Sequence, residues 1–199
     1  MSGRRQAYAQ SDPKSCGAVC IMSCVDELAG HGFAIGANVD EMKIHRQIWE
    51  RRADVSLASK VAAYLQTHKL NLELIDDKDK TDLIRASSAP FDLVYRRYKI
   101  DVRGSAVVRF RRRGGNAFTA TDFDSDARLM FMAILMGATG THWLLARRDA
   151  GDFWVMNPDG GSDSRITNLL TWMNGAWTTM QSIGGVNYLF SGTVLRVIA

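Results

Sequence analysis

A short, strongly apolar helix that starts with a cysteine is the feature that most constrains this chain. In residues 10–26, QSDPKSCGAVCIMSCVD, a polar loop leads to Cys16, with Ser15 placed to cap the helix and Gly30 placed to end it. The unpaired N–H groups and the positive end of the helix dipole at this position favour a thiolate over a thiol. The pattern therefore predicts a reactive sulfur at the exposed tip of a buried helix. The alternative is that Cys16 is a small apolar core residue, as free cysteines often are.

The three cysteines, at positions 16, 20 and 24, share one face of this helix. Their odd number and close spacing predict no disulfide framework, so the chain is expected to fold in a reducing compartment or to be independent of bridges if it is exported. A zinc site would need a fourth ligand, and no histidine nearby has the usual spacing. We therefore expect neither a metal ion nor a cofactor.

The composition is that of a globular protein. The chain has 199 residues, of which 46% are hydrophobic and 23% are charged, and this predicts a single domain over residues 1–199. The formal net charge is +4, and the only dense basic run is Arg109 to Arg113. A basic binding module is therefore an alternative to an enzyme. Phe110 is the one aromatic residue within this run and no known nucleic-acid motif accompanies it, so we expect no nucleic-acid partner.

Hydrophobic periodicity predicts helices in the first third of the chain and mostly strands in the last third. The expected helices after the first cover about residues 40–52, 56–69, 81–86, 127–136 and 166–173. The expected strands cover 70–76, 91–102, 105–113, 141–148, 152–157 and 186–199, with a bulge at Gly192. His45, on the second helix, is expected to be solvated. This order predicts an α+β fold, with the N-terminal helices packed on a mostly antiparallel sheet formed by the C-terminal half.

Neither a membrane span nor a secretory signal is expected. Residues 129–146 carry no formal charge when His142 is neutral, but their second half contains glycines and threonines that suit a turn and a buried strand better than a bilayer helix. The first residues, MSGRRQAY, have arginines without a following apolar segment. A cytoplasmic location, or export without a cleavable signal peptide, is the expectation.

A histidine and an asparagine stand at matching ends of a predicted hairpin. His142 opens the apolar strand HWLLA, Asn157 closes the strand DFWVMN, and the turn between them falls at Ala150–Gly151. An amide oxygen beside an imidazole can accept its Nδ1–H, fix the tautomer and leave the other nitrogen to face a thiol. The chain therefore offers a nucleophile, a base and an orienting group, as covalent catalysis requires.

These residues resemble the signature of papain-like cysteine peptidases. Gln10, five intervening residues and Cys16–Gly17–Ala18 are most similar to the bacteriocin-processing (double-glycine leader) peptidases and their stand-alone relatives. The resemblance implies a papain-like fold, Gln10 lining the oxyanion hole, Cys16 as nucleophile and His142 as base. The family has Asp-Pro where this chain has Asn157–Pro158. In having asparagine at this position, the chain resembles papain itself. Asp159 therefore competes with Asn157 as the third catalytic residue.

The resemblance implies a cysteine peptidase that cleaves a protein or peptide substrate. Cys16 and His142 lie further apart than in the bacteriocin family, which implies an insertion within about residues 70–125. The same residues could serve a glutamine deamidase or an amidase, and bacterial effectors with papain-like folds carry out both proteolysis and deamidation. An inactive peptidase homologue is a further alternative, and the sequence does not address oligomeric state.

Overall fold

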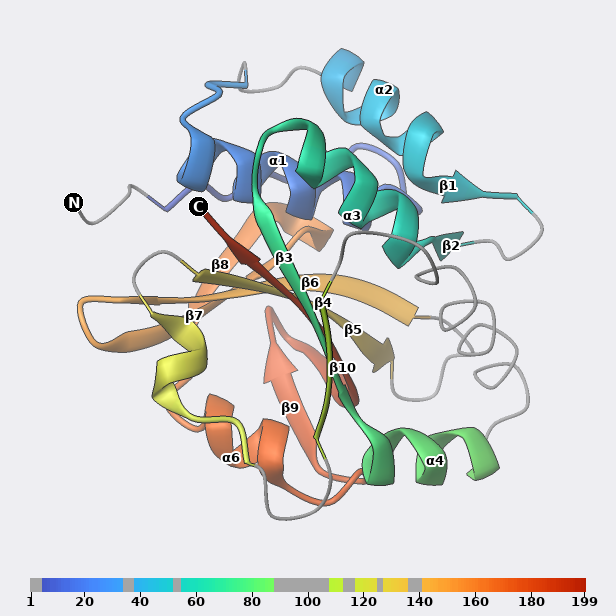
Figure 1. The fold of residues 1–199 in the computed structure, drawn as a ribbon, viewed down its shortest axis with the longest axis vertical. Helices are drawn as coiled ribbons and strands as arrows, with labels where there is room; N and C mark the ends of the chain where they lie inside the picture. Colours follow the sequence, from blue (N-terminus) through green and yellow to red (C-terminus); the bar gives the residue numbers. More distant parts are fainter. Residues whose placement is uncertain are drawn as a thin grey trace.

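The computed structural model describes residues 5–33, 38–51, 55–87, 108–112, 117–124, 127–135 and 141–199. Within these ranges the chain is an α+β protein built on a mostly antiparallel sheet (Figure 1). The helices are α1 (Cys16–Ala29), α2 (Asn38–Ile48), α3 (Ala58–Thr67), α4 (Lys78–Ser87) and α6 (Leu169–Asn174), with short 3₁₀ turns η1 (Ala120–Phe123) and η2 (Asp159–Gly161). None of the described helices is both long and apolar enough to cross a membrane.

The described part of the large sheet has the strand order β4-β3-β10-β5-β6-β7-β8, with β9 pairing to β10 off this path. Every pairing is antiparallel except that of β3 with β4. The strands of this sheet are β3 (Asn71–Asp77), β4 (Val108–Arg112), β5 (Ala127–Leu135), β6 (Thr141–Asp149), β7 (Asp152–Asn157), β8 (Ser162–Arg165), β9 (Met180–Ile183) and β10 (Val186–Ile198). A separate small ladder joins β1 (Trp49–Glu50) to β2 (Val55–Ser56).

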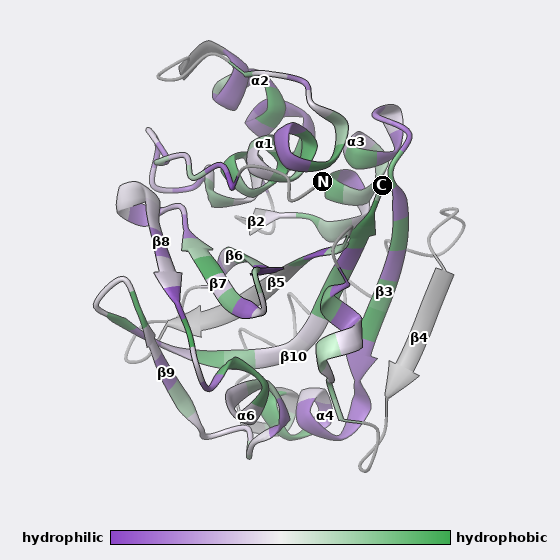
Figure 2. Ribbon diagram, turned by 90° about the vertical axis from the view of Figure 1, so that its left-hand side faces the viewer, coloured by the Kyte–Doolittle hydropathy of each residue, from purple (hydrophilic) through white to green (hydrophobic). Residues whose placement is uncertain are grey.

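Helices cover both faces of this sheet, with α1, α2 and α3 on one side and α4 and α6 on the other (Figure 1). Strand β6 shows the consequence for the side chains: Trp143 and Leu145 belong to the core beneath α1, whereas Leu144 and Ala146 belong to the core on the opposite face. A strand buried on both faces reads as a continuous apolar run, and the inner strands are accordingly more apolar than β8 at the edge (Figure 2).

The predicted α+β class with a mostly antiparallel sheet is confirmed, but the sheet is not confined to the C-terminal half. Strand β3 comes from the N-terminal half of the chain, and helices α4 and α6 cover the face opposite α1, so the helices on the sheet are not all near the N-terminus. The predicted strand 91–102 lies outside the described residues. The helix predicted over about 40–52 ends at Ile48, and Trp49–Glu50 forms β1 instead.

The helix predicted over 127–136 is wrong, because residues Ala127–Leu135 form the inner strand β5. This segment, ARLMFMAIL, is an apolar run without a polar face, and periodicity alone does not separate a buried helix from a buried strand. Strand β5 pairs with β10 on one side and with β6 on the other. Tertiary pairing on both sides therefore decided its conformation.

The predicted hairpin turn and the predicted bulge at Gly192 are both confirmed by the backbone. The β6–β7 hairpin turns at Ala150 (φ 49°) and Gly151 (φ 90°), with Asp149 paired to Asp152. Positive φ at both central residues is the geometry of a type I′ turn. In β10, Gly192 has φ 80° and lies where the pairing with β5 shifts register, as the predicted bulge requires.

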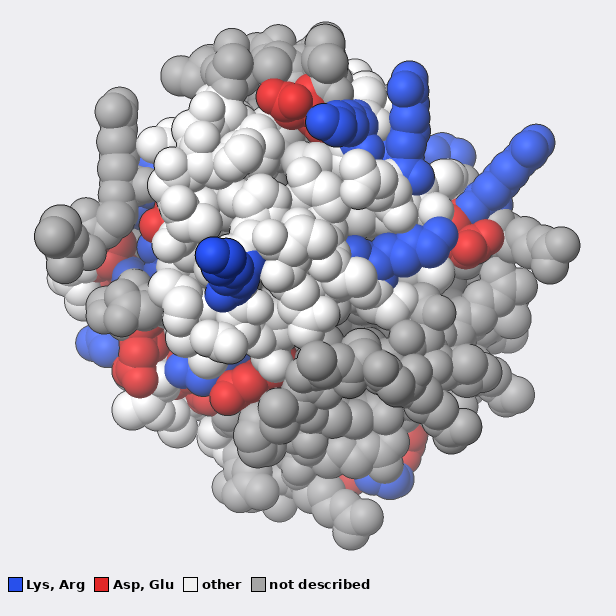
Figure 3. Space-filling model, turned by 45° about the horizontal axis from the view of Figure 1, so that its top comes forward, with Lys and Arg blue, Asp and Glu red and all other residues white. Residues whose placement is uncertain are grey.

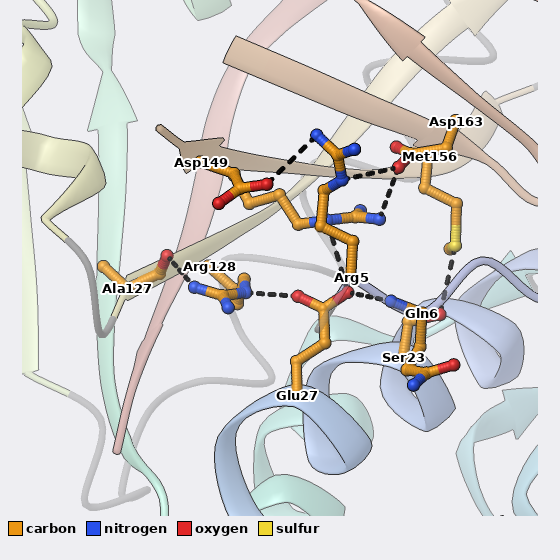
Figure 4. Close-up of polar contacts among 10 residues, drawn as sticks. Arg5, Gln6, Ser23, Glu27, Ala127, Arg128, Asp149, Met156 and Asp163 are labelled. Carbon is orange, nitrogen blue, oxygen red and sulfur yellow. Dashed lines mark hydrogen bonds and ion pairs between the residues drawn. The ribbon is translucent and has the colours of Figure 1, made fainter. Parts of the chain in front are cut away.

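A network of buried charges holds the C-terminal half of α1 on the sheet (Figure 4). The carboxylate of Glu27 pairs with Arg128 of β5 and, at 3.2 Å, with Arg147 of β6. Arg147 also lies 3.0 Å from Asp163 of β8, which pairs in turn with Arg5 at 3.3 Å. The side chains of Glu27 and Arg147 are almost wholly buried, so each charge depends on its partner for compensation.

Candidate active site

The loop before Cys16 is held differently from the expected capping arrangement. Ser15 occupies the N-cap position and its carbonyl oxygen accepts the N–H of Val19, but its hydroxyl makes no capping bond. The hydroxyl lies instead against the carbonyl oxygen of Asp12 and the carboxylate of Glu41 on α2. The prediction that Ser15 caps α1 with its side chain is therefore wrong, whereas Gly30 ends the helix at φ 63° as expected.

Cys16 is buried, with 7% of its surface exposed, and does not stand at an exposed tip. Burial raises the pKa of its thiol to about 11, while backbone N–H groups of Trp143, Gly17 and Cys16 itself act in the opposite direction. The expected stabilising N–H groups are therefore present, but desolvation outweighs them. The raised pKa of Cys16 favours a thiol in the resting site, in contrast to the predicted thiolate.

The start of α1 is packed tightly onto β2 and β6. A Cβ added at Gly17 would lie 2.8 Å from Cβ of Ser56 and 3.2 Å from Cδ1 of Trp143. The indole Nε1–H of Trp143 donates to the carbonyl oxygen of Ser56 at 3.2 Å and fixes the ring against this contact. Only glycine fits after the cysteine, and this close approach brings the thiol beside Trp143, the residue that follows His142.

His142 and Asn157 form a buried hydrogen bond of 2.8 Å between the ring Nε2 and the amide Oδ1. Because an amide oxygen only accepts, Nε2 carries the hydrogen and Nδ1 is the nitrogen that can receive a proton. The predicted pairing is therefore present, but the amide oxygen accepts from Nε2 and not from Nδ1 as expected. Among the described contacts, none is a hydrogen bond between the thiol of Cys16 and the ring of His142; such bonds are often long before substrate binds.

Asn157 is held from four directions. Its Oδ1 also accepts the backbone N–H of Asp159 at 3.0 Å, and its Nδ2 donates to Tyr188 at 3.1 Å and to the carbonyl oxygen of Ile183 at 3.5 Å. The side chain of Asp159 is exposed. Of the two competing residues, Asn157 thus contacts the imidazole, and Asp159 reaches it through a backbone bond to Asn157.

Tyr188 on β10 is a site residue that the sequence reasoning missed. Its ring stacks on His142 with centroids 5.8 Å apart and an interplanar angle of 14°, while its hydroxyl meets Asn157. Burial lowers the pKa of His142, and Asn157 and Asp159 act in the opposite direction. A neutral imidazole is the form that can accept a proton. No sequence signal distinguished Tyr188, because the same strand contains a second aromatic residue, Phe190.

Gln10 is brought to the same end of the hairpin by its backbone. Its N–H donates to the carbonyl oxygen of Pro158 at 2.9 Å, directly after Asn157. The approach depends on Gly161 (φ 65°), where a Cβ would lie 2.9 Å from that of Ala9. The side-chain Oε1 of Gln10 is buried and has no hydrogen-bond partner in the described structure. The backbone of Gln10 is therefore fixed near the site, while its side-chain amide oxygen makes no hydrogen bond in the described structure.

In the described residues no metal ligand set competes with this arrangement. No group of three His, Cys, Asp or Glu side chains comes together there as a metal ion requires. On the face drawn in Figure 3, the described Lys and Arg side chains are separated by uncharged surface or lie beside acidic ones. The side chains of Arg109 to Arg113 lie outside the described part.

His45, predicted to be solvated, is buried and packs on Trp49 with centroids 4.9 Å apart.

Comparison of the chain with models of known protein families and with curated protein sequences finds no match.

Proposed function

We propose that this protein is a papain-like cysteine peptidase that hydrolyses an amide bond of a protein or peptide. The observation that carries the proposal is the 2.8 Å bond between His142 and Asn157, placed where the cysteine helix meets β6. A neutral imidazole held by an amide oxygen, one residue before Trp143, whose backbone meets the thiol at the helix N-terminus, supplies the groups that acyl transfer requires. The resemblance of Gln10 and Cys16–Gly17–Ala18 to the papain-like signature supports the same reading.

In the proposed mechanism His142 accepts the thiol proton at Nδ1 as the sulfur attacks the substrate carbonyl. This order follows from the raised pKa of Cys16 and the lowered pKa of His142, which favour a neutral resting pair over an ion pair. The backbone N–H of Cys16 and the amide of Gln10 stabilise the oxyanion, and losing one such donor typically raises the barrier by about 2.7–4 kcal/mol. His142 then protonates the leaving amine and activates the water that releases the acyl group.

The test compares the wild-type chain with Cys16→Ala in a protein lysate and identifies the products by mass spectrometry. New peptide termini that appear only with the wild type support a peptidase. Glutamine residues converted to glutamate without chain cleavage would assign the same site to a deamidase. Absence of any Cys16-dependent product would favour an inactive homologue or a binding module. Asn157→Asp, which keeps an acceptor for His142, serves as a variant with a site close to the native one.

A further inference from the structure

The loop that joins the two proposed oxyanion donors is anchored by a side chain from a different helix. Gln10 stands at one end of this loop and Cys16 at the other, with residues 11–15 between them. The carboxylate oxygen Oε1 of Glu41, in the first turn of α2, accepts the backbone N–H of Ser11 at 2.8 Å and lies against the hydroxyl of Ser15. One buried atom thus holds the residue after Gln10 and the residue before Cys16.

Among the described contacts of the loop, this carboxylate is a buried anchor that bonds to two of its residues. Within the loop, Asp12 accepts the N–H of Lys14 at its side chain and that of Ser15 at its carbonyl oxygen. These local bonds shape a turn but do not fix its position relative to the rest of the protein. Contacts that do fix it include the bond from Gln10 to Pro158 and the bonds to Glu41, which is 4% exposed. The exposed Lys14 also lies over the ring of Trp49, at 5.6 Å from its centroid.

We propose that Glu41 is a positioning residue that sets the place of the Gln10 amide relative to Cys16, and so completes the oxyanion hole. The inference rests on the proposed function, because an oxyanion hole has meaning only for acyl transfer. Glu41 acts through the loop and does not touch the reacting atoms. A displacement of the donor by about 1 Å can cost on the order of 100-fold in rate, so the anchor has a large effect on catalysis.

The experiment uses two small reagents that differ in their need for an oxyanion hole. p-Nitrophenyl acetate acylates a thiol through a tetrahedral oxyanion and releases p-nitrophenolate, whereas iodoacetamide alkylates the sulfur by displacement of iodide and forms no oxyanion. The acylation burst and the alkylation of Cys16, measured by mass spectrometry, are followed for the wild type, Glu41→Ala and Glu41→Gln. Cys16→Ala provides the blank. Gln47→Ala, an exposed position on the same helix, is the matched control.

We expect Glu41→Ala to slow acylation by about 10- to 100-fold, while alkylation changes by less than about twofold. Glu41→Gln keeps an acceptor oxygen for Ser11 and Ser15 and should stay within about fivefold of the wild type. Adding Glu41→Ala to Gln10→Ala should cost less than about twofold more, because both changes remove the same donor.

Four outcomes would overturn the inference. They are unchanged acylation in Glu41→Ala, an equal fall of acylation and alkylation, a loss in Glu41→Gln as large as in Glu41→Ala, and additive losses in the double variant. If Glu41→Ala proves unfolded by circular dichroism, the Glu41→Gln comparison and its combination with Gln10→Ala decide the matter. A wild-type chain without a Cys16-dependent burst removes the proposed function itself, and this inference with it, so the two failures are distinguishable.

Discussion

The ring Nε2 of His142 bonds to Oδ1 of Asn157 although the two residues are not directly opposite each other in the β6–β7 ladder. Leu145 pairs with Met156, so continuing the register sets Asn157 against Leu144, and His142 is its diagonal neighbour on the same face. Residues 142 and 157, expected to lie roughly level, are thus offset by two positions in the register. A diagonal pair is still within reach of long side chains, and β7 ends at Asn157, where the chain turns into η2.

This geometry separates the roles of Asn157 and Asp159. Asn157→Ala should lower kcat by about 100-fold or more with little change in KM, because the imidazole loses the group that fixes its orientation. Asp159→Ala should be mild, since Asp159 contributes its backbone N–H, which alanine keeps. Steady-state kinetics on the substrate found in the lysate test checks both. A crippling Asp159→Ala with a tolerated Asn157→Ala would make Asp159 the third catalytic residue.

Tyr188 supports Asn157 by one hydrogen bond and His142 by stacking, and these effects can be separated. Tyr188→Phe keeps the ring but removes the hydroxyl that meets Asn157 Nδ2. A lost hydrogen bond worth about 1 kcal/mol predicts a fall in kcat of about fivefold. Tyr188→Leu removes both contacts and should be more severe. Equal kinetics for the wild type and Tyr188→Phe would show that the hydroxyl does not contribute.

The three cysteines should respond differently to alanine. Cys16→Ala should abolish activity and cost no more than about 1 kcal/mol of stability, because the start of a helix accepts alanine and only the packing of the buried sulfur is lost. Cys20→Ala and Cys24→Ala, both fully buried, should keep activity and lose about 1 kcal/mol of stability each. Activity assays and thermal melts on all three variants check this. Equal loss of activity from all three without unfolding would point to a metal site.

The pH dependence of thiol alkylation reports the resting state of the site. Since burial raises the pKa of Cys16 to about 11, the thiolate is a minor form at neutral pH, and its fraction grows as pH rises. The rate of Cys16 alkylation by iodoacetamide should therefore increase about tenfold per pH unit until it levels off near pH 11. Stopped-time alkylation across the pH range measures the profile. A plateau that begins at mildly acidic pH would instead show a resting thiolate–imidazolium pair.

The buried charge network beneath α1 offers a stability test with an internal control. Arg147→Met leaves the buried carboxylate of Glu27 and the half-buried carboxylate of Asp163 short of a partner and should cost about 3–5 kcal/mol. Arg165→Met breaks an exposed pair with Asp152 and should cost less than about 1 kcal/mol. Urea denaturation compares the two free energies of unfolding. Similar small losses would mean that the buried charges are compensated by other groups.

Much of the candidate site was predictable because its signals are local. The start of α1 is specified by a polar loop, a cysteine and the apolar run that follows. The hairpin that carries His142 and Asn157 is specified by an Ala-Gly turn between two apolar strands. Hydrophobic patterning likewise predicted the helices of the first third and the α+β class. The reason is that the periods of helices and strands, about 3.6 and 2 residues, appear in the spacing of apolar residues close together in the sequence.

Tertiary structure alone decided the conformation of Ala127–Leu135, the ionisation of Cys16 and the roles of Tyr188 and Glu41. An apolar run has no period that separates helix from strand, so pairing with β10 and β6 made β5. The pKa of a thiol depends on how much water its surroundings exclude, which local sequence does not encode. Tyr188 and Glu41 lie far along the chain from the residues they hold, and only folding brings their contacts into existence.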